Sequence, residues 1–577
     1  MTRTLFCLLL LAIAPLAQGE GVRYVLEIEG PEPYRTLIDN HIDLARWKDN
    51  PLLDEPQLQR LAEKTPDEIK RLLETEGYYS AKVSPSLTQK EGVWHAHFKV
   101  ELGERVHVEK TDIAFTGAIN EHPGEPSPAT LRGNWGLKSG APFRHADWEA
   151  AKHALLRDLT AKRYLGARIT SSRAAVDPAT QRADLAVGVD SGPVVRLGGT
   201  QVEGLQRYPK VIVDNLNPLH PGEEYDIDEL LKFQARLQDS GYFAIAGVTA
   251  EPDPNDPALA PVTVRVEENK QQSLGFGVGY STNTGARGQI DYQHNNLLGR
   301  GWRWLSTLKV ETKAQSMQSD LYLPIDAQGR RNSVGAKAER TDLQGVVSRT
   351  YSLYAKQARL RGDIETQTSL GYVFEHKDVA GSESEINRAL APNFSWTVRR
   401  VQPPLYPDRG YQLNWQLGGA SRVLASTQDF VRAYLKAIAL FPAGEHGTVT
   451  VRGESGLVFA RSRKGIPSDF LFRTGGDTTV RGYAYQSLGV PQGDATVGGR
   501  VLAVGSAEYT YWFKPQWGAA VFTDVGDAAD SRATFKLAKG YGVGARWKSP
   551  IGPVNADVAY GERKHAVRLH FSIGLAF

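Results

Sequence analysis

The chain ends with the stretch HAVRLHFSIGLAF, residues 565–577, in which apolar residues alternate with polar or small ones. The apolar register begins at Val567 and ends on the aromatic residue Phe577. Because successive side chains of a strand point to opposite faces, this pattern predicts a strand with one unbroken apolar face. Such a face suits the closing strand of a transmembrane barrel better than a strand of a soluble sheet.

The overall composition is compatible with a barrel. The mean hydropathy is −0.37 and 23% of the residues are charged, so the chain offers no apolar run of the roughly 20 residues that a membrane-spanning helix requires. Barrel strands alternate apolar and polar faces and pair every backbone group around a closed ring, which keeps the average hydropathy modest. The formal net charge of +3 gives no reason to expect nucleic acid as a partner.

Residues 1–19 have the pattern of a secretory signal peptide. An arginine precedes a short apolar core, and small residues then mark a cleavage site after Gly19. A signal anchor is the alternative, but the apolar core is too short to span a bilayer. The only cysteine, Cys7, lies in this segment, so the mature chain is expected to lack disulfides and cysteine-bound metal. Together with the terminal strand, this segment predicts a bacterial outer-membrane protein.

A unit of about 80 residues recurs between the expected signal peptide and residue 268. Helical periodicity is found at 66–76, 145–161 and 227–239. Each predicted helix runs into a tyrosine, and a pair of alternating segments follows each tyrosine; in chain order these residues are Tyr78, Tyr164 and Tyr242. The sequence therefore predicts three small α+β domains.

Each unit reads strand, helix, helix, strand, strand, and resembles the POTRA domains of the Omp85 superfamily. We place the three domains at residues 22–103, 104–192 and 193–268, with three unrelated α+β modules as the alternative. The resemblance implies that they lie in the periplasm. Edge strands of such domains can take up an extended client by β-augmentation.

From Ser273 onward, period-2 alternation is nearly continuous and predicts a transmembrane antiparallel β-barrel over residues 269–577. We count sixteen alternating segments, from 273–281 to 566–577. An even number of antiparallel strands is typical of bacterial outer-membrane barrels. The first segment places only small residues on its inner face, among them Gly275, Gly277 and Gly279.

One connection, residues 461–499, is too long for an ordinary turn and shows no clear alternation. It contains Val480-Arg481-Gly482-Tyr483, which resembles the tip of the inward-folded loop of Omp85 proteins. Four further segments resemble motifs of the same family in the same order; they are residues 296–301 (NLLGRG), 505–509 (GSAEY), 522–526 (FTDVG) and 542–553 (GVGARWKSPIGP). The resemblance covers essentially the whole mature chain.

The charges of these motifs predict how the loop is held. In a barrel lumen, the guanidinium of Arg481 is best satisfied by carboxylates that match its fork, and Glu508 and Asp524 can both face inward from the following strands. An exposed turn with an ordinary arginine is the alternative. We refer to the predicted arrangement as the loop lock.

The loop lock comprises four residues of the loop tip and four of the wall. Gly482 is expected to permit a tight turn, and Tyr483 to pack against the wall with Phe522 as a neighbour. The complete set is Val480, Arg481, Gly482 and Tyr483 on the loop with Glu508, Phe522, Asp524 and Gly526 on the wall.

The resemblance implies a protein that inserts β-barrel clients, such as autotransporters, into the lipid bilayer through a lateral seam, together with an inner-membrane partner. The seam would lie between the first and last barrel strands, where side-chain pairing is sparse. Its residues are Gly275, Gly277, Gly279, Ser572, Gly574 and Phe577. A secretion pore that passes an unfolded protein through the lumen is the alternative function.

No catalytic, metal or cofactor site is predicted. His95 and His97 share one strand face, but no third ligand is nearby. The glycine-rich segment 275–279 lies within a strand with no helix after it, which disfavours a dinucleotide loop. An outer-membrane lipase fusion lacks a candidate nucleophile. We therefore expect a protein that is not an enzyme.

Overall fold

The computed structural model describes residues 22–573 except 49, 123, 404, 405 and 551. The expected signal peptide and the seam residues Gly574 and Phe577 lie outside the described residues. The chain forms two compact units: the first comprises 1–201, 219–231 and 249–263, and the second 202–218, 232–248 and 264–577. Within the described residues, no helix combines the length and apolar character needed to cross a membrane.

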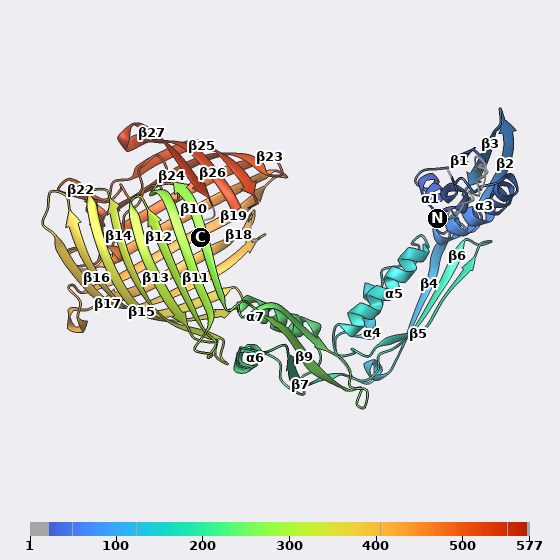
Figure 1. Ribbon diagram of the computed structural model, residues 1–577, viewed down its shortest axis with the longest axis horizontal. Helices are drawn as coiled ribbons and strands as arrows, with labels where there is room; N and C mark the ends of the chain where they lie inside the picture. Colours follow the sequence, from blue (N-terminus) through green and yellow to red (C-terminus); the bar gives the residue numbers. More distant parts are fainter. Residues whose placement is uncertain (1–21, 49, 123, 404–405, 551, 574–577) are drawn as a thin grey trace, which may run out of the picture. The chain divides into compact units, whose positions relative to one another are not determined.

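The first α+β domain packs three helices on a three-stranded sheet of order β1-β3-β2 (Figure 1). The longest helix begins well before residue 66, because the Asp54 side chain accepts a hydrogen bond from the Gln57 N–H and caps it. Pro66 lies inside this helix, where burial of residues such as Ile69 offsets its missing donor. The predicted start was therefore wrong. The elements are β1 (Tyr24–Glu29), α1 (Tyr34–His41), α2 (Asp43–Arg46), α3 (Glu55–Thr75), β2 (Lys82–Lys90) and β3 (Val93–Glu101).

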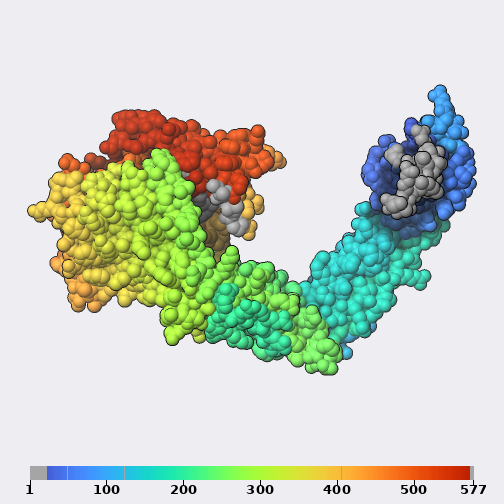
Figure 2. All heavy atoms as spheres, viewed as in Figure 1, coloured from blue at the N-terminus to red at the C-terminus, as the bar shows by residue number. Residues whose placement is uncertain are grey.

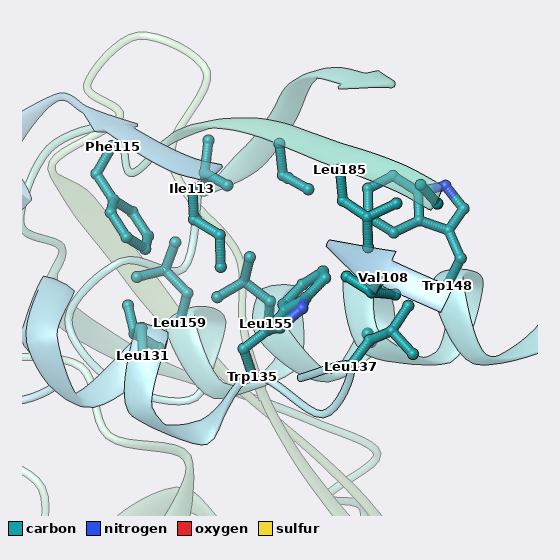
Figure 3. Packing of buried hydrophobic residues seen from close by; sticks show 14 of the residues in the cluster. Val108, Ile113, Phe115, Leu131, Trp135, Leu137, Trp148, Leu155, Leu159 and Leu185 are labelled. Carbon is teal, nitrogen blue, oxygen red and sulfur yellow. The ribbon is translucent and has the colours of Figure 1, made fainter. Parts of the chain in front are cut away.

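The second α+β domain has its own apolar core between its helices and a sheet of order β4-β6-β5. Figure 3 shows the core, in which the rings of Trp135 and Trp148 meet edge to face with centroids 5.9 Å apart. Tyr164, the second repeated tyrosine, is fully buried. The elements are β4 (His107–Thr116), η1 (Ala118–Asn120), α4 (Pro128–Asn134), α5 (His145–Thr160), β5 (Arg168–Asp177) and β6 (Arg182–Asp190).

The third α+β sheet has the order β7-β9-β8, and the boundary between the two units runs through it. As in the other two sheets, the strand that comes last in the chain lies in the middle. The elements are β7 (Arg196–Glu203), α6 (Val211–Leu216), α7 (Ile227–Asp239), β8 (Phe243–Ala250) and β9 (Leu259–Glu268).

The barrel is a nearly closed antiparallel sheet of sixteen strands in chain order, as the alternation predicts (Figures 1 and 2). The predicted faces are confirmed on the last strand, where Leu569 is 72% exposed and His570 only 5%. The strands are β10 (Gln272–Ser281), β11 (Gly285–Leu297), β12 (Trp302–Glu311), β13 (Ala314–Tyr322), β14 (Arg330–Leu343), β15 (Val346–Arg361), β16 (Ile364–Val379), β17 (Glu385–Gln402), β18 (Arg409–Ala420), β19 (Phe430–Ala443), β20 (Gly447–Phe459), β23 (Val501–Lys514), β24 (Trp517–Ala529), β25 (Ala538–Ser549), β26 (Gly552–Gly561) and β27 (Ala566–Ile573).

The two ends of this sheet meet without a ladder. The hydrogen-bonded order runs from β10 to β27, and among residues 272–573 no ladder joins β27 back to β10. Just beyond the end of β10, the Thr282 hydroxyl accepts a hydrogen bond from the Phe571 N–H at 3.4 Å. Val278 on β10 is 94% exposed, whereas Val310, on a strand paired on both sides, is 50% exposed. The first strand is therefore poorly covered at its outer edge.

Candidate functional site

The connection between β20 and β23 is an ordered loop anchored on the inner wall. It contains η3 (Ser468–Phe470) and a hairpin of β21 (Val490–Gln492) with β22 (Ala495–Val497), which the sequence analysis missed. The Ser468 N–H donates to the buried carboxylate of Glu375 on β16 at 3.0 Å. Because these short elements alternate with turns, no single period marks them in the sequence.

Arg481 at the loop tip is buried, with 2% of its side chain exposed, and is surrounded by carboxylates. Its guanidinium donates two hydrogen bonds to Asp524, at 2.7 and 2.9 Å, and its backbone N–H donates a third to the same group at 3.0 Å. A further bond of 2.6 Å reaches Glu508. The structure thus brings together the three charged residues of the predicted lock, in the bidentate geometry that a planar guanidinium favours.

Two wall residues that the sequence analysis missed complete the charge network. Asp557 on β26 accepts a bond from Arg481 at 3.3 Å and from Arg546 on β25 at 2.6 Å. Arg546 also donates to Glu508 at 2.9 Å. Alternating registers already place both residues on inward faces, but only the barrel's curvature brings strands β23 to β26 around one loop. Arg452 on β20 lies 4.0 Å from Asp524, so three guanidiniums face three carboxylates in a buried site.

The remaining lock residues pack around this network. Phe522 lies beneath the guanidinium of Arg481, whose central carbon is 3.3 Å from the ring centroid, a cation–π arrangement. Phe522 thus contributes to the lock through Arg481. The Tyr483 hydroxyl donates to the Lys539 carbonyl at 2.9 Å. Val480 is fully buried in an apolar cluster inside the wall. Gly526 lies on β24 opposite Val504.

Gly482 is required by its backbone conformation and by space. Its φ is +91°, in the region that favours glycine. A Cβ at this position would lie 2.7 Å from the backbone nitrogen of Gly561 on β26. The Gly482 N–H donates to Nε2 of the buried His570 at 3.0 Å. The loop tip therefore contacts the terminal strand directly, which the lock motif alone did not predict.

A cavity of about 750 Å³ reaches from the loop tip to both ends of the sheet. It is lined by Gly277 and Gly279 of β10, by Phe571 and Ile573 of β27, and by Arg481. A Cβ at Gly279 would meet no atom within 4 Å, so the inner face of β10 is bare at this point. Of the predicted seam residues, Gly277 and Gly279 thus line the same cavity as the described end of β27, whereas Gly275 does not line it.

The second unit also contains a polar joint next to the barrel. The Glu268 carboxylate, at the end of β9, accepts hydrogen bonds from the backbone N–H groups of residues 206, 207 and 208 at 2.8 to 2.9 Å, and from the Arg207 guanidinium at 2.8 Å. The Arg207 carbonyl in turn accepts from Asn296 in the motif after β11 at 2.9 Å. Burial by itself raises the pKa of Glu268, but these hydrogen bonds outweigh it and lower the pKa to about 2.

This depressed pKa predicts that acid weakens the joint. Because the pKa of a free glutamate is near 4.3, the charge of Glu268 stabilises the docked segment fully above that pH, and the stabilisation is lost as the pH falls through about 2. We expect pepsin to cut the segment 206–208 faster in Glu268→Gln than in the wild type at pH 5, with the ratio of rates falling toward one near pH 2.

The matched control is Glu203→Gln, which alters an exposed glutamate that pairs with Arg265 at 3.0 Å on neighbouring strands. This variant should be cut at the wild-type rate across the same range. A pH-independent ratio for Glu268→Gln would show that the charge of Glu268 does not hold the joint.

The described residues contain no group of three His, Cys, Asp or Glu side chains placed to hold a metal ion. His97 pairs with Glu29 at 3.3 Å, across strands β1 and β3. This contact gives His97 a structural partner on the neighbouring strand.

Fold and site together define the class: a sixteen-stranded, nearly closed antiparallel barrel with an inward-folded loop, preceded by POTRA-like α+β domains. The sequence pattern of the Omp85 superfamily domain matches residues 270–577, more than half of the chain. The chain therefore belongs to the Omp85 superfamily. A second pattern, described as POTRA domain TamA domain 1, matches residues 26–102.

Curated relatives include two proteins named outer membrane protein assembly factor BamA. The one from Nitratidesulfovibrio vulgaris is 24% identical over 65% of this chain and 50% of its own length. The one from Neisseria meningitidis serogroup B is 22% identical over 69% of this chain and 58% of its own length. The chain thus spans about half the length of the curated relatives it matches.

The fold is also that of a solved BamA. The crystal structure of BamA from Haemophilus ducreyi lacking POTRA domains 1-3 aligns with a TM-score of 0.67 and 15% identity, covering 81% of this chain and 98% of that one. At this identity the likeness establishes the fold.

Proposed function

We propose that this chain is an outer-membrane assembly factor of the TamA type, which inserts β-barrel clients such as autotransporters through a lateral seam between β10 and β27. The observation that carries the proposal is the break in the sheet: among the described residues, no ladder joins its first and last strands. A strand edge of this kind presents backbone N–H and C=O groups to an incoming strand.

The composition of β10 supports opening at this edge. Its inner face carries Gly275, Gly277 and Gly279, so few side chains can interlock across the seam. Side-chain pairs across strands contribute roughly 0.2–1 kcal/mol each. A seam without such pairs is easier to separate than the other strand junctions of the barrel.

The α+β domains support the TamA type in particular. The match of residues 26–102 to a TamA POTRA domain is one support, and the three recurring sheets are the other. In this proposal the domains at 22–103, 104–192 and 193–268 lie in the periplasm after removal of a signal peptide at 1–19, and they engage a TamB-like inner-membrane partner and unfolded clients. The protein acts by templating and insertion, without covalent catalysis.

Cysteine pairs across the seam test the proposal. Cys7 is the only cysteine of the sequence and precedes the described residues, so engineered pairs meet no competing thiol in the barrel. The contact between Thr282 and Phe571 guides a panel of three pairs: 282 with 571, 280 with 573, and 279 with 572. A disulfide forms only where the Cα atoms lie within about 7 Å, and we expect at least one pair to oxidise.

The oxidised protein should remain folded, as heat-modifiable migration in detergent reports, yet fail to assemble an autotransporter client in vesicles. Reductant should restore assembly. Full activity of a verified disulfide form would overturn lateral opening and favour passage of clients through the lumen as a secretion pore. The control is a cysteine pair at Gly418 and Asn393, which are paired on the neighbouring strands β17 and β18. This disulfide crosses no seam and should leave client assembly unchanged.

A further inference from the structure

We propose that the long loop is also a clasp on the seam: its tip is hydrogen-bonded to the terminal strand and its preceding turn to the first hairpin, so that one segment holds both edges of the open sheet. The inference rests on the proposed lateral seam. We call this set of contacts the seam clasp. It consists of Asp477, Gly482 and Tyr483 on the loop, with Asn283, Arg563 and His570 on the barrel.

On the terminal side, the clasp has two bonds. Nε2 of His570 on β27 accepts the Gly482 N–H at 3.0 Å, which requires a neutral imidazole with its proton on Nδ1. The Tyr483 hydroxyl accepts the Arg563 N–H at 3.0 Å, in the turn between β26 and β27. His570 is 5% exposed and Tyr483 1%. The bond to His570 is therefore shielded from water, and the bond from the exposed Arg563 partly so.

On the first-strand side, the clasp has a charge-assisted bond. The Asn283 amide, in the turn that follows β10, donates to the Asp477 carboxylate at 2.7 Å. The same turn is fixed to the end of the strand, since the Asn283 N–H donates to the Ser281 hydroxyl at 3.1 Å. A Cβ at Gly476 would lie 3.3 Å from the Asn283 side-chain oxygen, so the loop backbone lies close against this turn.

Only four residues of loop backbone separate Asp477 from Gly482, and the loop lock holds Arg481 between them. The segment 477–482 therefore connects the two groups of clasp bonds rigidly. Within the described residues, the seam itself contributes the bond between Phe571 and Thr282, whereas the loop contributes three. Because the clasp acts in series, its weaker side is the single bond from Asn283 to Asp477, which at 2.7 Å and to a carboxylate is stronger than the 3.4 Å bond of the seam. Opening the seam therefore requires the clasp to release.

The rate of disulfide formation between cysteines at 282 and 571, measured on the resting full-length protein in detergent without client or partner, tests the clasp. We expect His570→Ala to slow this rate several-fold, because the terminal edge loses one of its two bonds. His570→Gln should restore the rate, since its side-chain oxygen can accept the Gly482 N–H. The control, His565→Ala, alters a histidine of the same hairpin that contacts Tyr560, and should leave the rate unchanged.

The first-strand side needs its own variant, because loss of His570 leaves a buried donor and could disturb folding. Asn283→Asp places two carboxylates together at a half-buried turn, and should slow the disulfide at least as much as His570→Ala. The bonds to the terminal strand and to the first hairpin act in series, because breaking either one releases the clasp. The double variant His570→Ala with Asn283→Asp should therefore form the disulfide at the same rate as Asn283→Asp alone. The same rates are measured with cysteines at 280 and 573, which lie outside the clasp. Heat-modifiable migration in detergent shows whether each variant is folded.

Unchanged rates in both single variants, or additive effects in the double variant, would overturn the clasp. Either result leaves the seam proposal untouched, since the measurement uses no client. Conversely, full client assembly by a disulfide-locked protein would overturn lateral opening. That result does not depend on how fast the disulfide forms in the clasp variants.

Discussion

Replacing Arg481 with alanine is expected to release the loop from the wall and abolish client assembly. The substitution leaves Asp524, Glu508 and Asp557 facing one another in a buried site, where Arg546 still bonds Glu508 and Asp557 but Asp524 keeps only Arg452 at 4.0 Å. Removing one partner of a buried ion pair costs ~3–5 kcal/mol, because the other charge is left uncompensated. A cost of ~3 kcal/mol increases the open population of the loop on the order of 100-fold.

Hydrogen exchange of the peptide 475–488 measures this release, since the backbone amides of Arg481 and Gly482 both donate to buried wall groups. Arg481→Lys keeps the charge but loses the fork, so it should show an intermediate exchange rate and partial activity. Arg481→Glu should be at least as severe as alanine.

The control is Arg349→Ala, which removes a half-exposed arginine paired with Asp378 at 3.0 Å on the barrel. Exposed pairs of this kind contribute at most ~1 kcal/mol, so exchange of 475–488 and client assembly should stay at wild-type levels. Wild-type behaviour of Arg481→Ala and Arg481→Glu in both assays would show that the loop lock is not required.

The barrel could be predicted from the sequence because its strands carry their faces in a period of two. Leu569 and His570 are neighbours in the sequence and differ in exposure from 72% to 5%, which alternation alone predicts. All sixteen strands lie where alternation placed them. Hydropathy averaged over longer windows would have missed the barrel, since the polar residues of one strand face offset the apolar residues of the other in the average.

The loop and its partners were only partly predictable. The motif placed Arg481 near Glu508 and Asp524, but Arg546 and Asp557 enter the network through the curvature of the wall, which no local pattern records. The bond from Gly482 to His570 likewise joins residues 88 positions apart. Such contacts follow from closure of the sheet around the loop and are therefore visible only in three dimensions.

Of the three predicted helices, the first was misplaced for a local reason, whereas α5 and α7 lie where they were predicted. The predicted helix at 66–76 was started at a proline, which usually occupies the first turn. The true start is set by the capping side chain of Asp54 and by a second proline, Pro56, in the first turn of α3. The buried residues Leu58 and Leu73 lie on one face through Pro66, so the apolar stripe extends over the whole helix.

Deleting residues 22–103 is expected to abolish binding of the inner-membrane partner and assembly of clients, while the barrel still folds. The segment has its own core, with buried residues such as Leu58 and Phe98 drawn from within it. Its hydrogen bonds to the following domain gather at Glu76 and Gly77: the Val106 N–H donates to the Gly77 carbonyl at 2.9 Å, Arg105 donates to the Glu76 carbonyl at 3.0 Å, and Arg144 pairs with the Glu76 carboxylate at 2.9 Å. Tyr79 adds an apolar contact at the margin of the second core. The second domain retains a separate core, so its fold should survive the deletion.

Two measurements separate folding from function in this variant. Heat-modifiable migration in detergent should match the full-length protein, and co-purification of a TamB-like partner from membranes should be lost. Because β2 pairs with β3 along one edge and lies at the end of the sheet, its outer edge is the surface we expect a partner strand to use. Normal partner binding and normal client assembly by the truncated protein would show that the first domain takes no part in the relay, and would confine the proposed function to the two following domains and the barrel.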